Sequence, residues 1–244
     1  MTRYRLPMRW ADLDQLNHVN NVVYLEYAAE ARAALVDAGT LDAGLEDVAI
    51  GIDFVRPMLL STKLVEIDQE VDGDRLTQEV TQVVDGERVV FARVHTRLGG
   101  RGDLGPPAID GEVVQFRGRR GDLDARGHVD PVRYFEYFQE ARIITMAHAW
   151  STGELGRMVV ARLDVDYGPP VGWRHEPWEM TTAVTRVGGK SFHLSCEWRD
   201  GDVVVARNTA VLVGFDVETQ SSRALEPAEI AYLEGWGRTS PSSI

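Results

Sequence analysis

The chain contains one segment twice, and this internal repeat restricts its possible folds more than any other feature. Residues 9–32 and 119–142 align without a gap at an offset of 110, and 13 of their 24 positions are identical. Both copies share the pattern Asp-x-Asp-x-x-x-His-Val and, further on, the run Glu-Ala-Arg. A repeat of this length indicates two copies of one small domain in tandem rather than a single large domain.

The likeness continues more weakly downstream and locates the join between the copies. Residues 52–57 align with residues 165–170, and the offset drifts from 110 to 115 before it settles at 114. Such a drift is expected when loops gain residues while helices and strands do not. The intervening stretch, residues 99–111, is rich in Gly and Pro, which is typical of a linker. We therefore predict domains at 1–98 and 112–244, joined by this linker.

Each copy changes its hydrophobic periodicity once. Helical spacing of apolar residues predicts helices over Val22–Val36 and Val132–Met146, with Asn20 and Asp130 as N-caps and Pro131 in the first turn. Alternating runs rich in Val, Thr and aromatic residues predict strands, with the pair Asp85-Gly86 as a hairpin turn. The expected strands are 4–10, 47–58, 62–71, 75–84, 88–98, 112–119, 157–168, 176–187, 190–198 and 203–215.

The order strand, helix and four strands in each copy predicts an α+β fold. One long apolar helix suits an antiparallel sheet that curls around it. A further short helix is expected over Pro227–Leu233, followed by a frayed tail over residues 237–244.

Charge and composition exclude several functional classes. The formal net charge is −12, from 26 Lys and Arg against 38 Asp and Glu, which argues against a nucleic-acid or anionic-membrane surface. The single cysteine, Cys196, allows no intrachain disulfide and is expected to be buried. No stretch has the apolar core of a signal peptide or the length of a membrane span, so a cytoplasmic protein is expected.

The chemistry is expected in the polar loop that precedes each long helix. In the first copy this loop runs from Asp12 to Asn21 and leads into a helix N-terminus. Such an N-terminus offers unpaired N–H donors and partial positive charge, which can polarise a carbonyl. A carboxylate a few residues upstream can attack the polarised carbon or direct a water molecule at it. Asn17 and Gly127 suit a left-handed backbone in this loop.

The pattern Asp-x-Asp-x-x-x-His-Val-Asn-Asn-x-x-Tyr resembles the active-site loop of the 4-hydroxybenzoyl-CoA thioesterase-like hotdog family and of the related acyl-ACP thioesterases. The resemblance covers essentially the whole chain, once per half. It implies a double hotdog whose halves pack as a pseudo-dimer. It also implies hydrolysis of thioesters of coenzyme A or acyl carrier protein, with coenzyme A entering as part of the substrate and without a resident cofactor.

The same resemblance identifies candidate catalytic residues. In that family the second Asp of the pattern is commonly the catalytic carboxylate, which corresponds here to Asp14 and Asp124. His18, Asn20 and His128 match the polar positions that follow. Acyl-ACP thioesterases also place a polar residue two positions after that Asp. This chain has Leu16 there in the first half and Arg126 in the second, so an Asn-assisted version of that mechanism is not supported.

The two halves are not equivalent at the helix start. The first has His-Val-Asn-Asn and the second His-Val-Asp-Pro. Pro131 removes one N–H group and Asp130 adds negative charge, so we expect the first loop to be the better catalyst.

Several of these conserved-in-both-copies side chains could instead have purely structural roles. Asp12 and Asp122 are expected to anchor the loop, while Asp14 and Asp124 could do the same. The tyrosines at 24, 27, 134 and 137 are expected to pack under the helices. Glu26 and Arg32, repeated as Glu136 and Arg142, are expected to form ion pairs.

Two other functions are alternatives to hydrolysis. The alternatives are an acyl-CoA-binding module without catalysis and, disfavoured by the position of the histidine, a hotdog dehydratase or hydratase. No His or Cys spacing suggests a metal site. Arg56, Lys63, Arg119 and Arg120 are conceivable partners for the phosphates of coenzyme A, and assembly into a homo-oligomer is left open.

Overall fold

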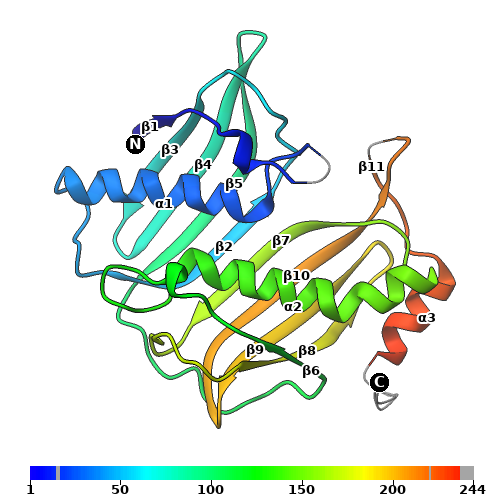
Figure 1. Ribbon diagram of the computed structural model, residues 1–244. Helices are drawn as coiled ribbons and strands as arrows, with labels where there is room; N and C mark the ends of the chain where they lie inside the picture. The colour runs from blue at the N-terminus through cyan, green and yellow to red at the C-terminus, as the bar shows by residue number, and fades with distance from the viewer. Residues whose placement is uncertain (15–16, 220, 237–244) are drawn as a thin grey trace. The chain divides into compact units, whose positions relative to one another are not determined.

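The computed structural model describes residues 1–14, 17–219 and 221–236, so that Leu16 and the tail 237–244 lie outside the described residues. The chain divides into two compact units, Met1–Arg101 (unit 1) and Gly102–Ile244 (unit 2). The division falls inside the segment 99–111 that the sequence marks as a linker. Each unit has its own long helix and its own strands (Figure 1).

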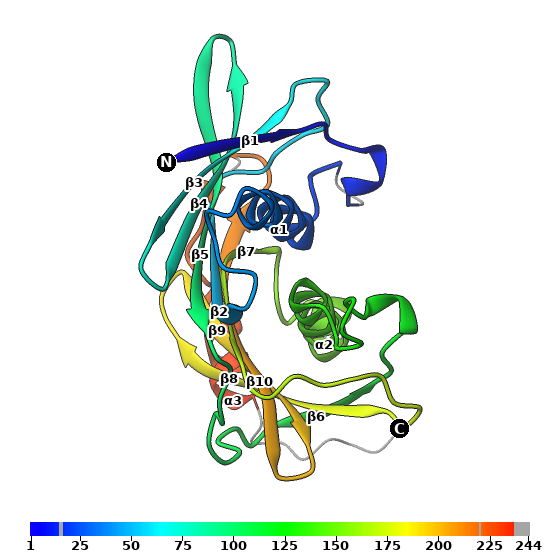
Figure 2. The same ribbon diagram turned by 90° about the vertical axis from the view of Figure 1, so that its left-hand side faces the viewer.

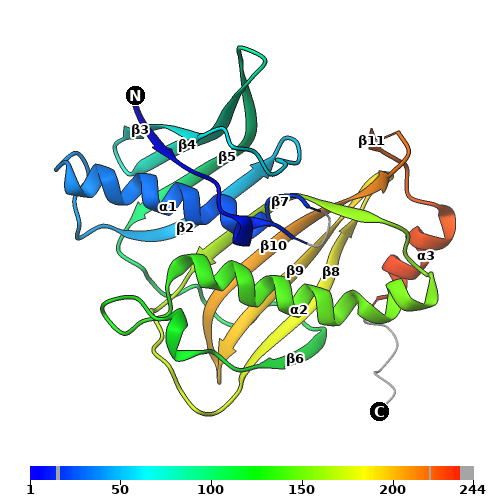
Figure 3. The ribbon, with the colours of Figure 1, turned by 45° about the horizontal axis from the view of Figure 1, so that its top comes forward.

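Unit 1 is one helix lying along one face of a five-stranded antiparallel sheet (Figure 2). The strands are ordered β1-β3-β4-β5-β2, so the first strand lies at an edge beside β3 (Figure 3). Its elements are β1 (Thr2–Leu6), a 3₁₀ turn η1 (Trp10–Asp12), α1 (Asn21–Asp37), β2 (Glu46–Phe54), β3 (Val65–Asp72), β4 (Arg75–Val84) and β5 (Glu87–Gly99).

Unit 2 repeats this topology. Its strands are ordered β6-β8-β9-β10-β7, which is the order of unit 1 with each strand replaced by its repeat. Its elements are β6 (Glu112–Phe116), η2 (Arg120–Asp122), α2 (Pro131–Thr152), β7 (Met158–Tyr167), β8 (Trp178–Val187), β9 (Ser191–Asp200), β10 (Val203–Asp216), the short β11 (Ser221–Ser222) and α3 (Pro227–Gly235). The predicted α+β unit, a helix wrapped by an antiparallel sheet, is therefore present in both copies.

The helices begin where the sequence predicts. Asn20 caps α1 by accepting a hydrogen bond from Val22 N–H at 3.0 Å, and Asp130 caps α2 by accepting one from Val132 N–H at 2.9 Å. The end of α2 was predicted too early, at Met146. The helix continues to Thr152, where Gly153 ends it with a left-handed backbone at φ 77°.

The core of each unit lies between its helix and its sheet. In unit 1, Ala31 of α1 and Ile67 and Leu76 of the sheet have no exposed surface. In unit 2 the centre is Trp198 of β9, fully buried, with the ring of Tyr134 from α2 at 4.7 Å between centroids. The expectation that Cys196 is buried is confirmed. Each helix is therefore held along its length against the sheet, which fixes the position of its N-terminus.

A buried glutamate holds part of the linker to unit 2. Glu197 of β9 is fully buried, pairs with Arg199 and Arg207, and accepts hydrogen bonds from Ala108 N–H and Ile109 N–H. Burial alone would raise the pKa of Glu197, but the two arginines and the two N–H groups outweigh it and lower the pKa.

Among the described residues, no helix combines the length and the apolar character that a membrane crossing requires.

Candidate active site

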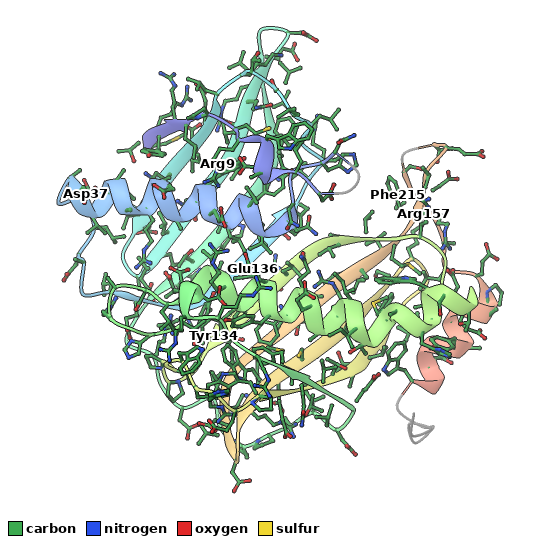
Figure 4. The ribbon with its side chains drawn as sticks, in the orientation of Figure 1. Arg9, Asp37, Tyr134, Glu136, Arg157 and Phe215 are labelled. Atoms are coloured by element: carbon green, nitrogen blue, oxygen red, sulfur yellow. The ribbon has the colours of Figure 1, made fainter. Side chains whose placement is uncertain are left out.

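The loop of unit 1 is anchored by Asp12, which is 1% exposed. Its carboxylate accepts hydrogen bonds from Arg9 N–H at 2.7 Å, Arg9 Nε–H at 2.9 Å and the Tyr27 hydroxyl at 2.5 Å (Figure 4 labels Arg9). Burial, and next the hydrogen bond to Asp12, raise the pKa of Tyr27, so this hydroxyl is a donor at any physiological pH. The prediction that Asp12 anchors the loop is confirmed.

The same anchor exists in unit 2. Asp122 accepts hydrogen bonds from Arg119 N–H at 2.9 Å and from the Tyr137 hydroxyl at 2.6 Å. Tyr27 and Tyr137 were predicted only to pack, and the structure adds this hydrogen bond to their role. The sequence does carry a signal for it, because an Asp is followed by a Tyr after 15 residues in both copies.

Asp14 and His18 close the loop of unit 1 on each other. Asp14 N–H donates to His18 O at 2.7 Å, and His18 N–H donates to Asp14 Oδ1 at 3.0 Å. The tight turn between them requires a left-handed residue, and Asn17 supplies it at φ 58°, as predicted. Asp14 is thus held in place by the backbone of His18, and both side chains are partly exposed.

The carboxylate of Asp14 lies within electrostatic reach of the first turn of α1. Burial raises the pKa of the Tyr24 hydroxyl to about 12, and the negative charge of Asp14 contributes to the rise. The Tyr24 hydroxyl accepts a hydrogen bond from Met58 N–H at 3.0 Å, and Met58 O accepts one from Val19 N–H at 2.8 Å. These bonds join the loop, the helix and the segment after β2 into one frame.

The N–H groups at the start of α1 are almost all engaged. Asn20 N–H donates to Asp12 O at 2.9 Å, Val22 N–H to Asn20 Oδ1 at 3.0 Å and Val23 N–H to Asn20 O at 3.0 Å. The N–H of Asn21 takes part in none of the hydrogen bonds found among the described residues. Of the unpaired N–H donors expected at this helix start, only that of Asn21 has no acceptor among the described residues, and it lies at the positive end of the helix dipole.

The loop carboxylate of unit 2 is held by two backbone N–H groups. Asp124 Oδ1 accepts hydrogen bonds from His128 N–H at 2.9 Å and from Arg126 N–H at 2.8 Å. The guanidinium of Arg126 stands 3.9 Å from Asp124 Oδ2. Gly127 supplies the left-handed residue at φ 80°. The backbone frame matches that of unit 1, but a positive side chain now stands beside the carboxylate.

The helix start of unit 2 lacks the N–H that is available in unit 1. Asp130 and its neighbours repeat the capping bonds of Asn20, and the residue between Asp130 and Val132 is Pro131, which has no N–H. The carbonyl of Pro131 also accepts a hydrogen bond from the Tyr167 hydroxyl at 2.9 Å. The single donor left open in unit 1 is therefore the one that unit 2 has lost.

The loop and helix start of unit 1 thus contain a carboxylate, an N–H without an acceptor among the described residues, and a partly exposed histidine. This set can polarise a carbonyl and deliver a base or a nucleophile to its carbon. Among the described residues, no group of three or more His, Cys, Asp or Glu side chains is placed to hold a metal ion.

Comparison with known protein families covers both halves of the chain. Residues 119–233 match the profile of the thioesterase-like superfamily, and residues 1–88 match that of the acyl-ACP thioesterase C-terminal domain. The chain thus matches a thioesterase family in each half. It is a thioester hydrolase, and the resemblance seen in the loop sequence is confirmed by both matches.

Solved structures similar to this thioesterase extend over most of its length. One is described as an oleoyl thioesterase from Lactobacillus plantarum, with a TM-score of 0.67 and 13% identity over 88% of this chain and 96% of that one. Another is an acyl-ACP thioesterase from Bacteroides thetaiotaomicron, with a TM-score of 0.60 and 14% identity over 86% and 97%. A third is the 12:0-ACP thioesterase from Umbellularia californica, with a TM-score of 0.61 and 12% identity over 86% and 93%. At these identities the likeness establishes a shared hotdog-type fold.

No curated protein sequence matches the thioesterase.

Sequence reasoning missed two features of the thioesterase that depend on tertiary hydrogen bonds. The Tyr24 hydroxyl positions Met58, which no local pattern indicates. Arg142 was expected to form an ion pair, and among the described residues it forms none, whereas Arg32 pairs with Asp47. Glu136 instead pairs with Arg133.

Proposed function

We propose that the loop of unit 1 is the catalytic centre for acyl thioester hydrolysis and that unit 2 is catalytically weak or silent. The observation that carries this proposal is the N–H of Asn21. It has no acceptor among the described residues, lies at the start of α1, and its counterpart in unit 2 is the imide nitrogen of Pro131.

The chemistry follows from this N–H group and the carboxylate of Asp14. The thioester carbonyl oxygen accepts a hydrogen bond from Asn21 N–H, and the helix dipole favours the negative charge that develops there. With Asp14 as general base, the carboxylate takes a proton from water while the water oxygen bonds to the carbonyl carbon. The tetrahedral intermediate then expels the thiolate, and Asp14 returns the proton to the sulfur.

Asp14 as nucleophile is the alternative route to the same products. Its oxygen would bond to the carbonyl carbon and displace the thiolate, giving a mixed anhydride that water then cleaves. A single turnover in ¹⁸O-labelled water separates the routes. General-base catalysis places ¹⁸O in the acid from the first turnover, whereas attack of water on the Asp14 carbonyl of the anhydride leaves the first product unlabelled.

His18 and Asn20 serve as supports in this proposal. The backbone of His18 holds the Asp14 carboxylate, and Asn20 caps the helix whose first N–H polarises the substrate. In unit 2, His128 and Asp130 hold the same positions around Asp124, but without an N–H at the next residue.

The proposed substrates are acyl thioesters of coenzyme A, with acyl carrier protein as the second carrier to be compared. The matched family and the names of the similar structures point to acyl thioesters in general. A cytoplasmic location, and the pairing of the two units as a pseudo-dimer, stay predictions from the sequence.

The decisive experiment measures thiol release from acyl-CoAs of short, medium and long chain and from an aromatic acyl-CoA. Wild type, Asp14→Asn and Asp124→Asn are compared at equal concentration, and circular dichroism verifies folding. We expect Asp14→Asn to abolish turnover and Asp124→Asn to leave most of it. Equal losses would refute the asymmetry. Saturable acyl-CoA binding with no turnover of any thioester would identify a binding module instead.

A further inference from the structure

Four exposed apolar side chains border the loop of unit 1. Trp10 of η1 is 76% exposed, and Leu59, Leu60 and Leu64, in the segment between β2 and β3, are 58%, 47% and 49% exposed. We call these four residues the rim patch. A single exposed apolar side chain needs no explanation, but a contiguous group of them marks a surface that contacts another molecule.

The two segments that carry the rim patch are held side by side. At one end, Leu6 of β1 lies opposite Val65 of β3. Toward the other end, Leu59 forms a β-bridge with His18 of the loop. Because η1 lies between β1 and the loop in the chain, Trp10 is held next to the segment that contains the leucines.

The same two segments touch each other in unit 2. Trp10 corresponds to Arg120 in the repeat. Leu60 corresponds to Trp173, since each is the residue after the bridge partner of the loop histidine. The guanidinium carbon of Arg120 lies 3.7 Å from the centroid of the Trp173 ring, and Trp173 Nε1–H donates to Gly118 O at 3.2 Å. Unit 2 therefore covers its aromatic ring with its own cation, whereas unit 1 has Trp10 and Leu60 at these positions and leaves both exposed.

The local charge beside the rim patch is opposite in sign to that of the whole chain. Residues 54–65 contain Arg56 and Lys63 and no Asp or Glu, although the net charge of the chain is −12. Both cations are exposed, and neither forms an ion pair among the described residues. Salt screens charges beyond about 8 Å at physiological ionic strength, so the net charge does not decide how this face meets an anionic surface. The corresponding residues of unit 2 are Pro169 and Glu176, so these cations are present in unit 1 alone.

We propose that unit 1 docks on an anionic lipid surface through the rim patch, with Arg56 and Lys63 at the level of the headgroups. Tryptophan is favoured at the boundary between headgroups and acyl chains, leucine is favoured among the acyl chains, and cations next to an anionic leaflet strengthen binding. The rim patch and its two cations are few beside the roughly 20–30 residues that a standard protein interface takes from each partner. A lipid surface needs no matching contour. Because Leu59 pairs with His18, docking brings the loop of unit 1 to the lipid.

Cosedimentation with vesicles tests the proposal. The anionic vesicles are phosphatidylcholine with one quarter phosphatidylglycerol, and pure phosphatidylcholine is the uncharged comparison. We expect wild type to bind the anionic vesicles and to be released as the salt concentration rises. Trp10→Ser should weaken this binding roughly tenfold or more, because it removes the largest apolar side chain of the rim patch. Val113→Ser is the matched control, since Val113 is 56% exposed on β6 and lies outside the rim patch, and it should bind as wild type does.

Two further variants separate the roles of charge and of insertion. Lys63→Glu introduces the residue type that unit 2 has at this position. It should weaken binding to the anionic vesicles roughly tenfold or more and leave binding to pure phosphatidylcholine unchanged. Brominated phosphatidylcholine should quench the tryptophan fluorescence of vesicle-bound wild type, because bromine quenches a ring that enters the lipid. Trp10→Phe should keep the binding and lose the quenching. Quenching that persists in Trp10→Phe would place another face of the chain in the lipid and overturn the proposal.

The remaining outcomes decide between a lipid surface and a protein partner. Wild type that binds neither kind of vesicle, or equal losses in Trp10→Ser and Val113→Ser, would refute lipid docking. Wild type that ignores vesicles but binds acyl carrier protein, with losses in Trp10→Ser and Lys63→Glu, would assign the rim patch to an acidic protein instead. No thioester is present in these assays, so their result is independent of the proposed hydrolysis. A chain that binds vesicles in this pattern but cleaves no thioester would keep the docking surface and lose the proposed function.

Discussion

Replacing Asn21 with proline removes a single N–H group from α1 and should change little else. This N–H has no acceptor among the described residues, so no hydrogen bond of the fold is lost. Proline fits the first position of a helix, where φ is already near its preferred value. The preceding residue must be extended, and Asn20 is, at φ −58° and ψ 140°. Unit 2 has the same cap geometry, φ −60° and ψ 135°, before its own proline.

The magnitude follows from the role that we assign to this donor. Loss of one oxyanion-binding hydrogen bond costs about 10²- to 10³-fold in kcat, or roughly 3–4 kcal/mol of transition-state stabilisation. The free energy of unfolding should change by less than about 1 kcal/mol, because proline at a compatible site acts mainly on the unfolded chain. Asn21→Pro is therefore expected to uncouple activity from stability.

The assay is thiol release under saturating acyl-CoA, with thermal unfolding followed by circular dichroism on the same samples. Asn21→Ala is the matched control, since it deletes the side chain but keeps the N–H, and it should retain turnover. Pro131→Ala tests whether restoring an N–H in unit 2 adds activity. A folded Asn21→Pro variant with kcat within about twofold of wild type would refute the assignment. Equal losses in Asn21→Pro and Asn21→Ala would assign the effect to the side chain.

Three further predictions concern stability. The hydrogen bond from Arg223, together with those from Glu226 N–H and Gly156 N–H, lowers the pKa of the 5%-exposed Glu229 from 4.5 to about 2. These contacts should stabilise the fold by roughly 3 kcal/mol above pH 4.5, and that contribution is lost as the pH falls toward 2. Glu229→Gln should lower Tm at pH 7 and flatten its acid dependence, and an unchanged Tm would contradict this. Glu197→Gln leaves two arginines uncompensated, so it should lower the free energy of unfolding by about 3 kcal/mol and speed proteolysis within the linker. Unaltered cleavage would argue against Glu197 holding the linker to unit 2. Tyr27→Phe and Tyr137→Phe should each cost about 1–3 kcal/mol, but only the first should impair turnover, and equal impairment would contradict a silent unit 2.

Much of the fold can be predicted from the sequence because the same local patterns occur in both copies. The helix starts, the N-caps and the left-handed Asn17 follow from local rules that act within a few residues. The strands were predicted within a few residues of their ends for the same reason. The extension of α2 to Thr152 was missed although Ala149 and Trp150 continue the helical spacing after Met146, and the stop at Gly153 is a single-residue signal.

The residues of the candidate site could be predicted from the sequence, but which of their hydrogen-bonding groups lack a partner could not. Asp14, His18 and Asn20 stand out by pattern, yet only the hydrogen-bond pattern shows that one of several N–H groups at the helix start is uncommitted. Arg142 has no acid equivalent to the Asp47 that pairs with Arg32, and this difference could not be predicted from the sequence for a related reason. It depends on matching two bulged strands across a region where the sequence repeat is weak, so the equivalence of Asp47 and Val160 appears only in the register.

Duplication explains how one chain can contain a loop with an open N–H group at its helix start and a second loop that lacks this group. Both copies keep the groups that fold the loop, the carboxylates Asp12 and Asp122 with their tyrosine donors, since losing them would leave buried charge unsatisfied. One group that differs is not needed by the fold, because the N–H of Asn21 has no acceptor among the described residues. A copy relieved of catalysis can lose the N–H at no cost in stability. The acid that pairs with Arg32 has no counterpart beside Arg142, and this difference carries a cost, because the Nη1 of Arg142 is buried without a partner among the described residues.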